Sequence, residues 1–212
     1  MPLKIDLHVH SHYSADSGIT PEDIIRYARK RGLDGVAITD HDRIDGALRI
    51  AEKIALLVIP GIEVSSRDGH IVGLCVNEVI LPRLSAGETV KKIHATGGIA
   101  VACHPISLFK GGLGRHLTSG FDAVETINSS VFPFGYSVKN AERIASHLGV
   151  ARVAGSDAHY GPEIGYAHTL VDAEPTVDDV IEAIRNKLCQ PFGKAIPLTL
   201  RVKRKLLTSF RK

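Results

Sequence analysis

The sequence is poor in cysteine, and the spacing of its cysteines excludes the usual cysteine chemistry. Cys75, Cys103 and Cys189 are the only three among 212 residues, and no two of them stand at CxxC spacing. We therefore expect neither a disulfide framework nor a thiolate zinc site, and we expect a reducing, cytoplasmic location. The first residues do not resemble a signal peptide, and no apolar run approaches the roughly 18 residues that a membrane span needs.

The chain also lacks the glycine-rich motifs that bind nucleotide phosphates. Neither GxGxxG nor a Walker-type loop follows the first apolar run, which disfavours an open nucleotide-binding sheet. No linker long enough to separate domains is present. We therefore predict a single domain over residues 1–200.

Acidic side chains are absent from the last twelve residues. This segment, 201–212, holds six basic residues, whereas the other 200 residues carry 20 basic and 23 acidic ones. We predict a basic C-terminal tail, either a solvated, solubilising terminus or a segment that contacts phosphates or another anionic surface.

Short apolar runs alternate with amphipathic segments along most of the chain. The expected strands cover 4–9, 35–40, 56–65, 70–76, 98–104, 123–128, 152–157 and 168–173. The expected helices cover 20–32, 47–55, 87–97, 138–149 and 176–188. The first helix has Thr20 as N-cap, Pro21 at its first position and Gly32 at its end. This alternation indicates an α/β fold with a mostly parallel sheet, and seven or eight units in about 200 residues favour a closed barrel.

The eleven histidines are the most unusual feature of the composition. In an α/β barrel, functional residues gather at the carboxyl ends of the strands, and many of these histidines stand there beside carboxylates. Eight candidate metal ligands follow this pattern: His8, His10, Asp16, His41, Glu63, His104, Asp157 and His159. Nitrogen and oxygen ligands without thiolates suit Zn²⁺, Mn²⁺ or Fe²⁺. Eight ligands exceed the needs of one ion, so we predict two or three ions with a bridging carboxylate such as Glu63.

The segments DLHVH, TDHD, GIEVS, ACHP and GSDAH resemble the successive motifs of the PHP (polymerase and histidinol phosphatase) family. The resemblance runs from Ile5 to about His168 and implies a distorted (β/α)7 TIM-like barrel with a trinuclear metal centre. It also implies three groups of ligands: His8, His10, Glu63 and Asp157; Glu63 with His70 or His104 or both; and Asp16, His41 and His159. Asp16 has an alternative role as a cap of the helix that begins near Thr20. His70 resembles a ligand of the branch that acts on nucleotides and RNA.

Other residues near these motifs have weaker assignments. His12, His168 and His116 could contact the ligands or the substrate, whereas His94 and His147 lie on predicted helices and suit surface or packing positions. Strand alternation next to His104 predicts that the Cys103 side chain points away from the metals.

The predicted activity is hydrolysis of a phosphate ester by a metal-bound hydroxide that attacks phosphorus in line. Arg43 is the best candidate to orient the phosphate, ahead of Arg67, Lys110 and Arg115. Asp40 and His159 are candidates to protonate the leaving group.

The substrate is less well defined by the sequence. Only 40 residues separate Glu63 from His104, too few for the large insertion that resembling phosphoesterases often carry, so we expect an open mouth. A small phosphomonoester or nucleotide is favoured. One alternative is a 5′–3′ exonuclease-type phosphodiesterase acting on RNA or DNA ends, with the basic tail contacting phosphates. Another is a non-catalytic, nucleic-acid-associated scaffold. No membrane partner is expected.

Overall fold

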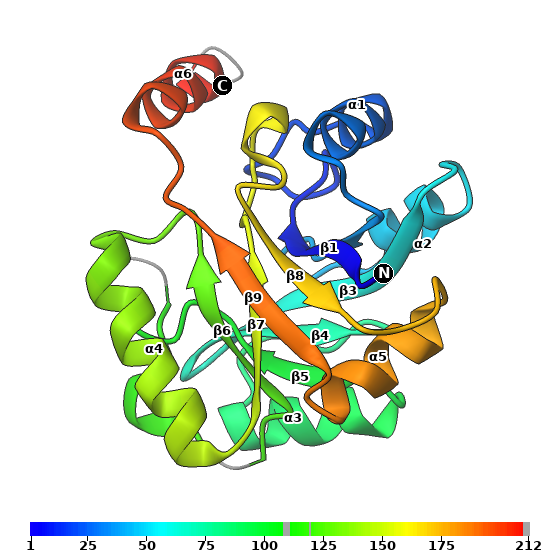
Figure 1. Cartoon of the computed structure of the whole chain (residues 1–212). Coiled ribbons are helices and arrows are strands. Elements are labelled where there is room, and N and C mark those ends of the chain that lie inside the picture. The colour runs from blue at the N-terminus through cyan, green and yellow to red at the C-terminus, as the bar shows by residue number, and fades with distance from the viewer. Residues whose placement is uncertain (108–110, 119, 210–212) are drawn as a thin grey trace.

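The described part of the chain forms a nearly closed α/β barrel (Figure 1). The computed structural model describes residues 1–107, 111–118 and 120–209. Within them, nine strands form one sheet in the order β7-β6-β5-β4-β3-β2-β1-β8-β9. The strands are β1 (Leu3–Val9), β2 (Gly35–Ile38), β3 (Leu57–Ser66), β4 (Gly69–Leu74), β5 (Ile99–Ala102), β6 (Ala123–Asn128), β7 (Ala151–Gly155), β8 (Ala167–Val171) and β9 (Cys189–Gly193).

Six α-helices and two short 3₁₀ helices accompany these strands in the described residues. They are α1 (Pro21–Arg31), α2 (Asp45–Ala51), α3 (Ala86–Ala95), α4 (Phe134–Leu148), α5 (Val177–Arg185), α6 (Leu198–Ser209), η1 (Gly114–His116) and η2 (Gly161–Glu163). None of these helices is both long enough and apolar enough to cross a lipid bilayer. The predicted distorted TIM-like barrel is confirmed.

The sheet is mixed, so the expectation of a mostly parallel sheet was wrong. Four of the eight strand pairings between described strands are antiparallel. β3 and β4 are joined by only Arg67 and Asp68, which allows a hairpin but not the crossover that parallel strands require. β8 follows β7 with only η2 between them and also runs antiparallel to β1.

The barrel closes where the carboxyl end of β7 meets that of β1. The Asp157 N–H donates to the carbonyl of His8 at 2.8 Å, and the His10 N–H donates to the carbonyl of Ala158 at 3.0 Å. Gly155 is required at this junction, because a Cβ there would lie 2.3 Å from the Cβ of His8. The closure therefore brings the first and the seventh strand ends together.

Two apolar layers support the barrel. The inner cluster includes Ile5, Leu7 and Ile59 from the strands, together with Val180 and Ile184 of α5. The outer cluster packs helix residues such as Ile24, Ile50 and Ile93 against the outward side chains of the strands. The strand ends that carry the candidate ligands thus stand on a packed core.

Local sequence signals located α1 well but missed the end of the chain. Thr20 and Asp23 form a capping box, and Gly32 ends α1 in the left-handed conformation. In contrast, α2 begins at Asp45 and is shorter than the predicted 47–55 helix. Neither β9 nor α6 was predicted: β9 contains Pro191 and Gly193, and α6 occupies much of the segment that its charge marked as a tail.

Candidate metal centre

All nine predicted ligands lie together at one end of the barrel. β1 and the residue after it carry His8 and His10, and the loop before α1 carries Asp16. The other positions are His41 after β2, Glu63 in β3, His70 in β4, His104 after β5, and Asp157 and His159 after β7. Their ligand atoms form overlapping groups, and within each group the atoms lie within 4.8 Å of one another.

Glu63 is the centre of the cluster, since its two carboxylate oxygens face five imidazoles. Oε1 lies 2.8 Å from His70 Nδ1 and 2.9 Å from His104 Nε2. Oε2 lies 3.1 Å from His10 Nε2 and 3.3 Å from both His8 Nε2 and His41 Nδ1. The side chain is only 1% exposed. A carboxylate between two sets of ring nitrogens has the arrangement that a bridging ligand needs.

Asp157 supplies the second buried carboxylate. Its Oδ1 lies 3.5 Å from His10 Nε2, 3.9 Å from His8 Nε2 and 3.5 Å from His159 Nδ1. The Asp157 backbone has a φ of 54°, which is unusual for a residue other than glycine. The left-handed conformation occurs here at the junction of β7 with β1.

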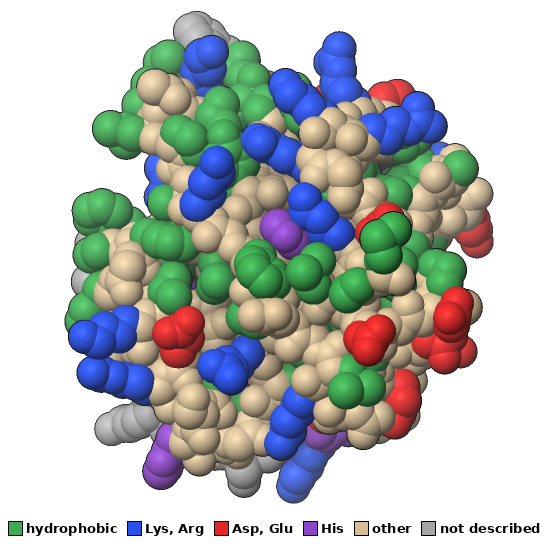
Figure 2. All heavy atoms as spheres, viewed as in Figure 1, with side chains coloured by type: hydrophobic (Ala, Val, Ile, Leu, Met, Phe, Trp, Pro, Cys, Tyr) green, Lys and Arg blue, Asp and Glu red, His purple; other side chains and the backbone are tan. Residues whose placement is uncertain are grey.

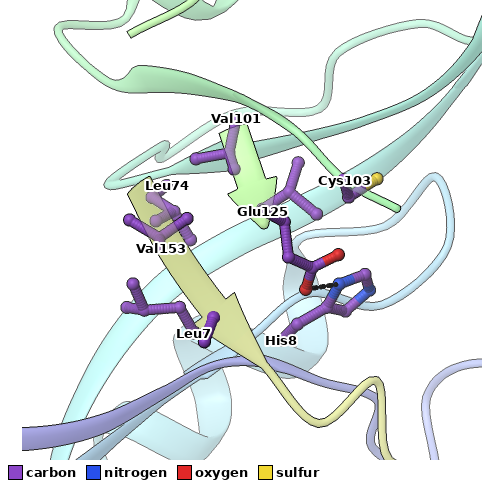
Figure 3. Close-up of a pocket in the computed structure, with 9 residues that line it drawn as sticks. Leu7, His8, Leu74, Val101, Cys103, Glu125 and Val153 are labelled. Carbon is purple, nitrogen blue, oxygen red and sulfur yellow. Dashed lines mark hydrogen bonds and ion pairs between the residues drawn. The ribbon is translucent and has the colours of Figure 1, made fainter. Parts of the chain in front are cut away.

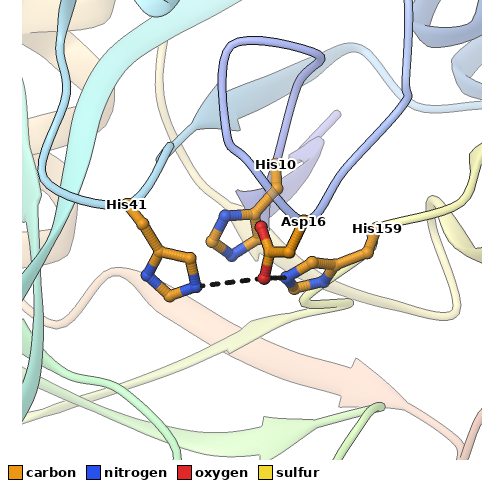
Figure 4. Close-up of side chains that lie close together, drawn as sticks. All are labelled: His10, Asp16, His41 and His159. Atoms are coloured by element: carbon orange, nitrogen blue, oxygen red, sulfur yellow. Dashed lines mark ion pairs between the residues drawn. The ribbon is translucent and has the colours of Figure 1, made fainter. Parts of the chain in front are cut away.

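A more open group lies on the solvent side of the cluster (Figure 4). Asp16 Oδ2 lies 3.0 Å from His159 Nε2 and 3.5 Å from His41 Nε2, and His10 completes the group. The Asp16 side chain is 50% exposed, whereas those of His10 and Glu63 are 0% and 1% exposed. The cluster is therefore accessible to solvent from the Asp16 side.

The charges of the cluster depend strongly on one another. Burial alone would lower the pKa of His8, but the carboxylates of Glu125, Asp157 and Glu63 raise it well above its ordinary value. Burial likewise opposes charge on His10, yet contacts with Asp157 and Glu63 raise its pKa to about 9. The surrounding histidines outweigh the burial of Glu63 and hold its pKa well below its usual range. The buried carboxylates are thus stabilised by positive charge close to them.

Sequence reasoning missed Glu125 and Asn128, which orient the candidate ligands. Glu125 Oε1 pairs with His8 Nδ1 at 3.0 Å, and its Oε2 accepts from the His104 N–H at 2.8 Å (Figure 3). Asn128 Nδ2 donates to Glu125 at 2.9 Å and to Asp157 Oδ2 at 3.2 Å. A buried glutamate in the apolar strand AVETIN was the signal that could have revealed this role.

Cys103 points toward the cluster, so the prediction that it points away was wrong. Its Sγ lies 3.5 Å from Glu63 Oε1, and its side chain belongs to the inner cluster of the barrel. Alternation along β5 directs Val101 and Cys103 inward, and it would direct His104 outward. A φ of 32° at His104 breaks this alternation and turns the imidazole inward as well.

The residues predicted to act on the substrate occupy different surroundings. The Asp40 carboxylate is buried and accepts hydrogen bonds from Ser11, at 2.6 Å from N and 2.7 Å from Oγ. Arg43 is exposed and pairs with Asp45 at 2.8 Å. Lys110 and the side chain of Arg115 lie outside the described residues.

The other histidines are peripheral to the cluster. His12 contacts the Tyr13 ring, His116 lies 3.9 Å from Asp68, and His168 stacks on Phe192. His94 pairs with Asp122 at 2.7 Å, and His147 is exposed.

The donor atoms of the cluster fit divalent cations. His8 uses Nδ1 for Glu125, which leaves its Nε2 facing His10 Nε2 at 3.2 Å and Glu63 Oε2 at 3.3 Å. Lone pairs that converge in this way need a cation or protons between them. A carboxylate on the far nitrogen of an imidazole is also the usual support of a metal-bound histidine. The fold and this cluster define an α/β barrel with a buried histidine and carboxylate cluster that is consistent with metal binding.

Comparisons with known proteins agree with this class. The PHP-associated family matches residues 135–189. An uncharacterized protein of Methanocaldococcus jannaschii is 37% identical over 141 residues, which are 60% of this chain and 82% of that protein. A phosphoribosyl 1,2-cyclic phosphate 1,2-diphosphodiesterase of Eggerthella lenta is 40% identical over 101 residues, but this match covers 42% of this chain and only 38% of that enzyme.

Two solved structures share the fold at low sequence identity. A two-domain protein from Bacteroides vulgatus, described as containing a predicted PHP-like metal-dependent phosphoesterase, superposes with a TM-score of 0.74 at 19% identity. That match covers 92% of this chain and 65% of the other. PsfC from Pseudomonas syringae gives a TM-score of 0.75 at 16% identity, with 99% of both chains covered. The chain belongs to the PHP family of metal-dependent phosphoesterases.

Proposed function

We propose that the protein hydrolyses the phosphate ester of a small molecule or a nucleotide. The observation that carries this proposal is the buried Glu63 carboxylate, which lies within 3.3 Å of nitrogens of five imidazoles in a cluster accessible from the Asp16 side. Such a cluster concentrates ligands for more than one ion at a surface that a substrate can reach.

The proposed ligands divide into three overlapping groups. His8, His10, Glu63 and Asp157 hold one ion. Glu63 with His70 and His104 holds a second, and Asp16, His41 and His159 hold a third. We propose two or three ions of Zn²⁺, Mn²⁺ or Fe²⁺, since histidine and carboxylate sites accept each of them. Bound ions would supply a deprotonated water at neutral pH and would offset the charge of the phosphoryl oxygens.

The surrounding residues prepare the ligands for this role. Glu125 holds the proton of His8 on Nδ1, which leaves Nε2 free to bind an ion. Asp40 holds both the backbone and the side chain of Ser11, next to His10. The Asp40 carboxylate is buried and accepts from Ser11. In the form with two ions, we therefore favour His159, at the open side, as the group that exchanges a proton with the leaving group. Arg43, on the rim, is proposed to orient the phosphate.

The favoured substrate is a phosphorylated small molecule. The similar Eggerthella lenta enzyme is named for a cyclic phosphate of a sugar, which supports this choice. A second candidate function is hydrolysis at RNA or DNA ends, and the basic residues of α6 support it. A 5′–3′ exoribonuclease of Haemophilus influenzae is also 37% identical over 81 residues, 35% of this chain and 29% of that enzyme.

The test measures product formation by the Mn²⁺-loaded protein: p-nitrophenol from p-nitrophenyl phosphate and bis-p-nitrophenyl phosphate, inorganic phosphate from AMP, and shorter fragments or nucleotides from a short RNA. His8→Ala should abolish turnover, and EDTA should do so reversibly. His147→Ala removes an exposed histidine on α4 and is the matched control.

Each pattern of turnover selects one function. Turnover of monoesters alone supports the small-molecule phosphatase, and cleavage of the RNA supports the nuclease. Cleavage of bis-p-nitrophenyl phosphate without cleavage of the RNA supports a phosphodiesterase that acts on a small molecule. No turnover by protein with verified bound Mn²⁺ contradicts both and favours a non-catalytic scaffold.

A further inference from the structure

Helix α6 presents most of its apolar residues to solvent and two arginines to the barrel, the reverse of a usual surface helix. The exposed fractions of Leu198, Val202 and Leu206 are 75%, 51% and 57%. Arg201 and Arg204 are only partly exposed. Basic side chains gather over α6 and α1 at the top of the molecule (Figure 2). Contacts of the two arginines, rather than apolar burial, therefore hold α6 against the barrel.

Arg204 contacts the segment that carries His159. Its Nη1 donates to Glu163 Oε2 at 3.0 Å, and the Glu163 side chain is completely buried. The same oxygen accepts from the backbone N–H groups of His159 at 3.1 Å and of Tyr160 at 3.2 Å. In Figure 1, α6 stands near the yellow segment between β7 and β8, and η2 belongs to that segment. Glu163 thus joins Arg204 to the backbone of a candidate ligand.

Arg201 makes a parallel connection to the loop after β6. Its guanidinium donates to the carbonyls of Ser129 at 2.9 Å and Ser130 at 3.0 Å. The Ser130 N–H in turn donates to Asn128 Oδ1 at 2.9 Å. This bond fixes the orientation of the Asn128 amide, whose Nδ2 reaches Asp157 Oδ2 at 3.2 Å.

We propose that Arg204 and Arg201 of α6 are positioning residues of the metal centre. Arg204 acts through Glu163 on His159, and Arg201 acts through the 128–130 segment on Asp157. This inference rests on the proposed function, because it concerns ligands of the proposed ions. Neither arginine is proposed to touch the ions.

The two connections should affect the ions unequally. His159 belongs to the group with Asp16, which is the most exposed part of the cluster, so the ion held there depends most on the His159 backbone. Asp157 has additional support from its own backbone bond to His8. Loss of Arg204 should therefore weaken the outer ion while the ions at Glu63 remain bound.

The experiment measures Mn²⁺ binding to the full chain by equilibrium dialysis and metal analysis, without substrate. Arg204→Gln should lower the affinity for the outer ion, which we expect to be the most weakly bound, by about 10- to 100-fold. This is the usual effect of losing a residue that supports a ligand. Arg204→Lys keeps a charge that can pair with Glu163 and should restore much of the affinity. Lys203→Gln, an exposed position on the same helix, removes the same charge and should bind as the wild type does. Near-ultraviolet circular dichroism reports whether each variant keeps its packed core.

The outcomes separate this inference from the proposed function. Wild-type affinity for every ion in Arg204→Gln would overturn the inference alone. So would equal loss of all ions together with the dichroism signal, because a general structural role gives that result. Selective loss of one ion supports the inference even if the protein hydrolyses none of the tested esters. A wild-type protein that binds no Mn²⁺ would overturn both proposals.

Discussion

Replacing Glu63 by glutamine should disable the metal centre with little change in shape. The substitution keeps the size of the side chain but removes the one negative charge that faces five imidazoles. Two unit charges about 4 Å apart interact by about 4 kcal/mol at an effective dielectric constant of about 20. A divalent ion at Glu63 should lose at least this much binding free energy. Its affinity should therefore fall about 1000-fold.

This loss can be read from thermal unfolding. At a free Mn²⁺ concentration about 1000 times the wild-type Kd, binding stabilises the folded protein by about 4 kcal/mol. For a chain of this size, that free energy corresponds to a rise in Tm of about 8–16 °C. The variant at the same concentration should gain only about 0.4 kcal/mol, and its Tm should rise by about 1–2 °C.

The matched control is Glu142→Gln on the exposed face of α4, which should keep the full Mn²⁺-dependent rise in Tm. Equilibrium dialysis should give the same ratio of affinities as the thermal shifts. If Glu63→Gln binds Mn²⁺ as tightly as the wild type, Glu63 is not a ligand, and the division of the cluster into groups around it is incorrect.

Three further predictions concern pH, packing and thiol reactivity. Without metal, the pKa of His10 is about 9, compared with 6.5 for an ordinary histidine. The stabilising effect of the protonated His10 ring should therefore be complete below about pH 6.5 and lost as pH rises through 9. Mn²⁺ binding needs the neutral ring and should weaken as pH falls, so urea unfolding with and without Mn²⁺ should show these opposite trends. Gly155→Ala should abolish metal binding and destabilise the fold by about 1–3 kcal/mol, because the new Cβ overlaps His8; wild-type stability in urea would refute the close approach. Cys103 is completely buried and its thiol has a raised pKa, so a thiol reagent should modify it only after unfolding; rapid labelling of the native protein at this residue would contradict that burial.

The positions of the candidate ligands could be predicted because the signal is local. Most of the segments that carry candidate ligands end an apolar run, and the carboxyl ends of parallel strands meet at one end of a barrel. His70, at the start of β4, and Asp16, in the loop before α1, are the exceptions. His8, His41 and Asp157 illustrate this pattern, since β1, β2 and β7 each lead directly to one of them. The α1 boundaries were readable for a similar reason, because the Thr20 cap and Gly32 act within one helical turn.

The supporting contacts could not be predicted in the same way. Glu125 and His8 are 117 residues apart, and no local periodicity relates them. β4 runs antiparallel to β3, and β8 runs antiparallel to β1. Short connections before these strands cause this direction, whereas repeated βα units predict parallel strands. In the sequence, the arginines of α6 are indistinguishable from a solvated basic terminus, because the partner of Arg204, Glu163, is 41 residues away.

The sequence by itself determined the types of candidate ligand, their order along the chain and most of the strand ends that carry them. Tertiary structure alone decided that five of the imidazoles converge on Glu63 and that Cys103 faces inward with His104. The physical reason is that His104 and Asp157 adopt positive φ values, which cost energy locally and persist only because the surrounding barrel holds them. Hydrophobic periodicity cannot predict such conformations, because it reflects only the regular backbone of helices and strands.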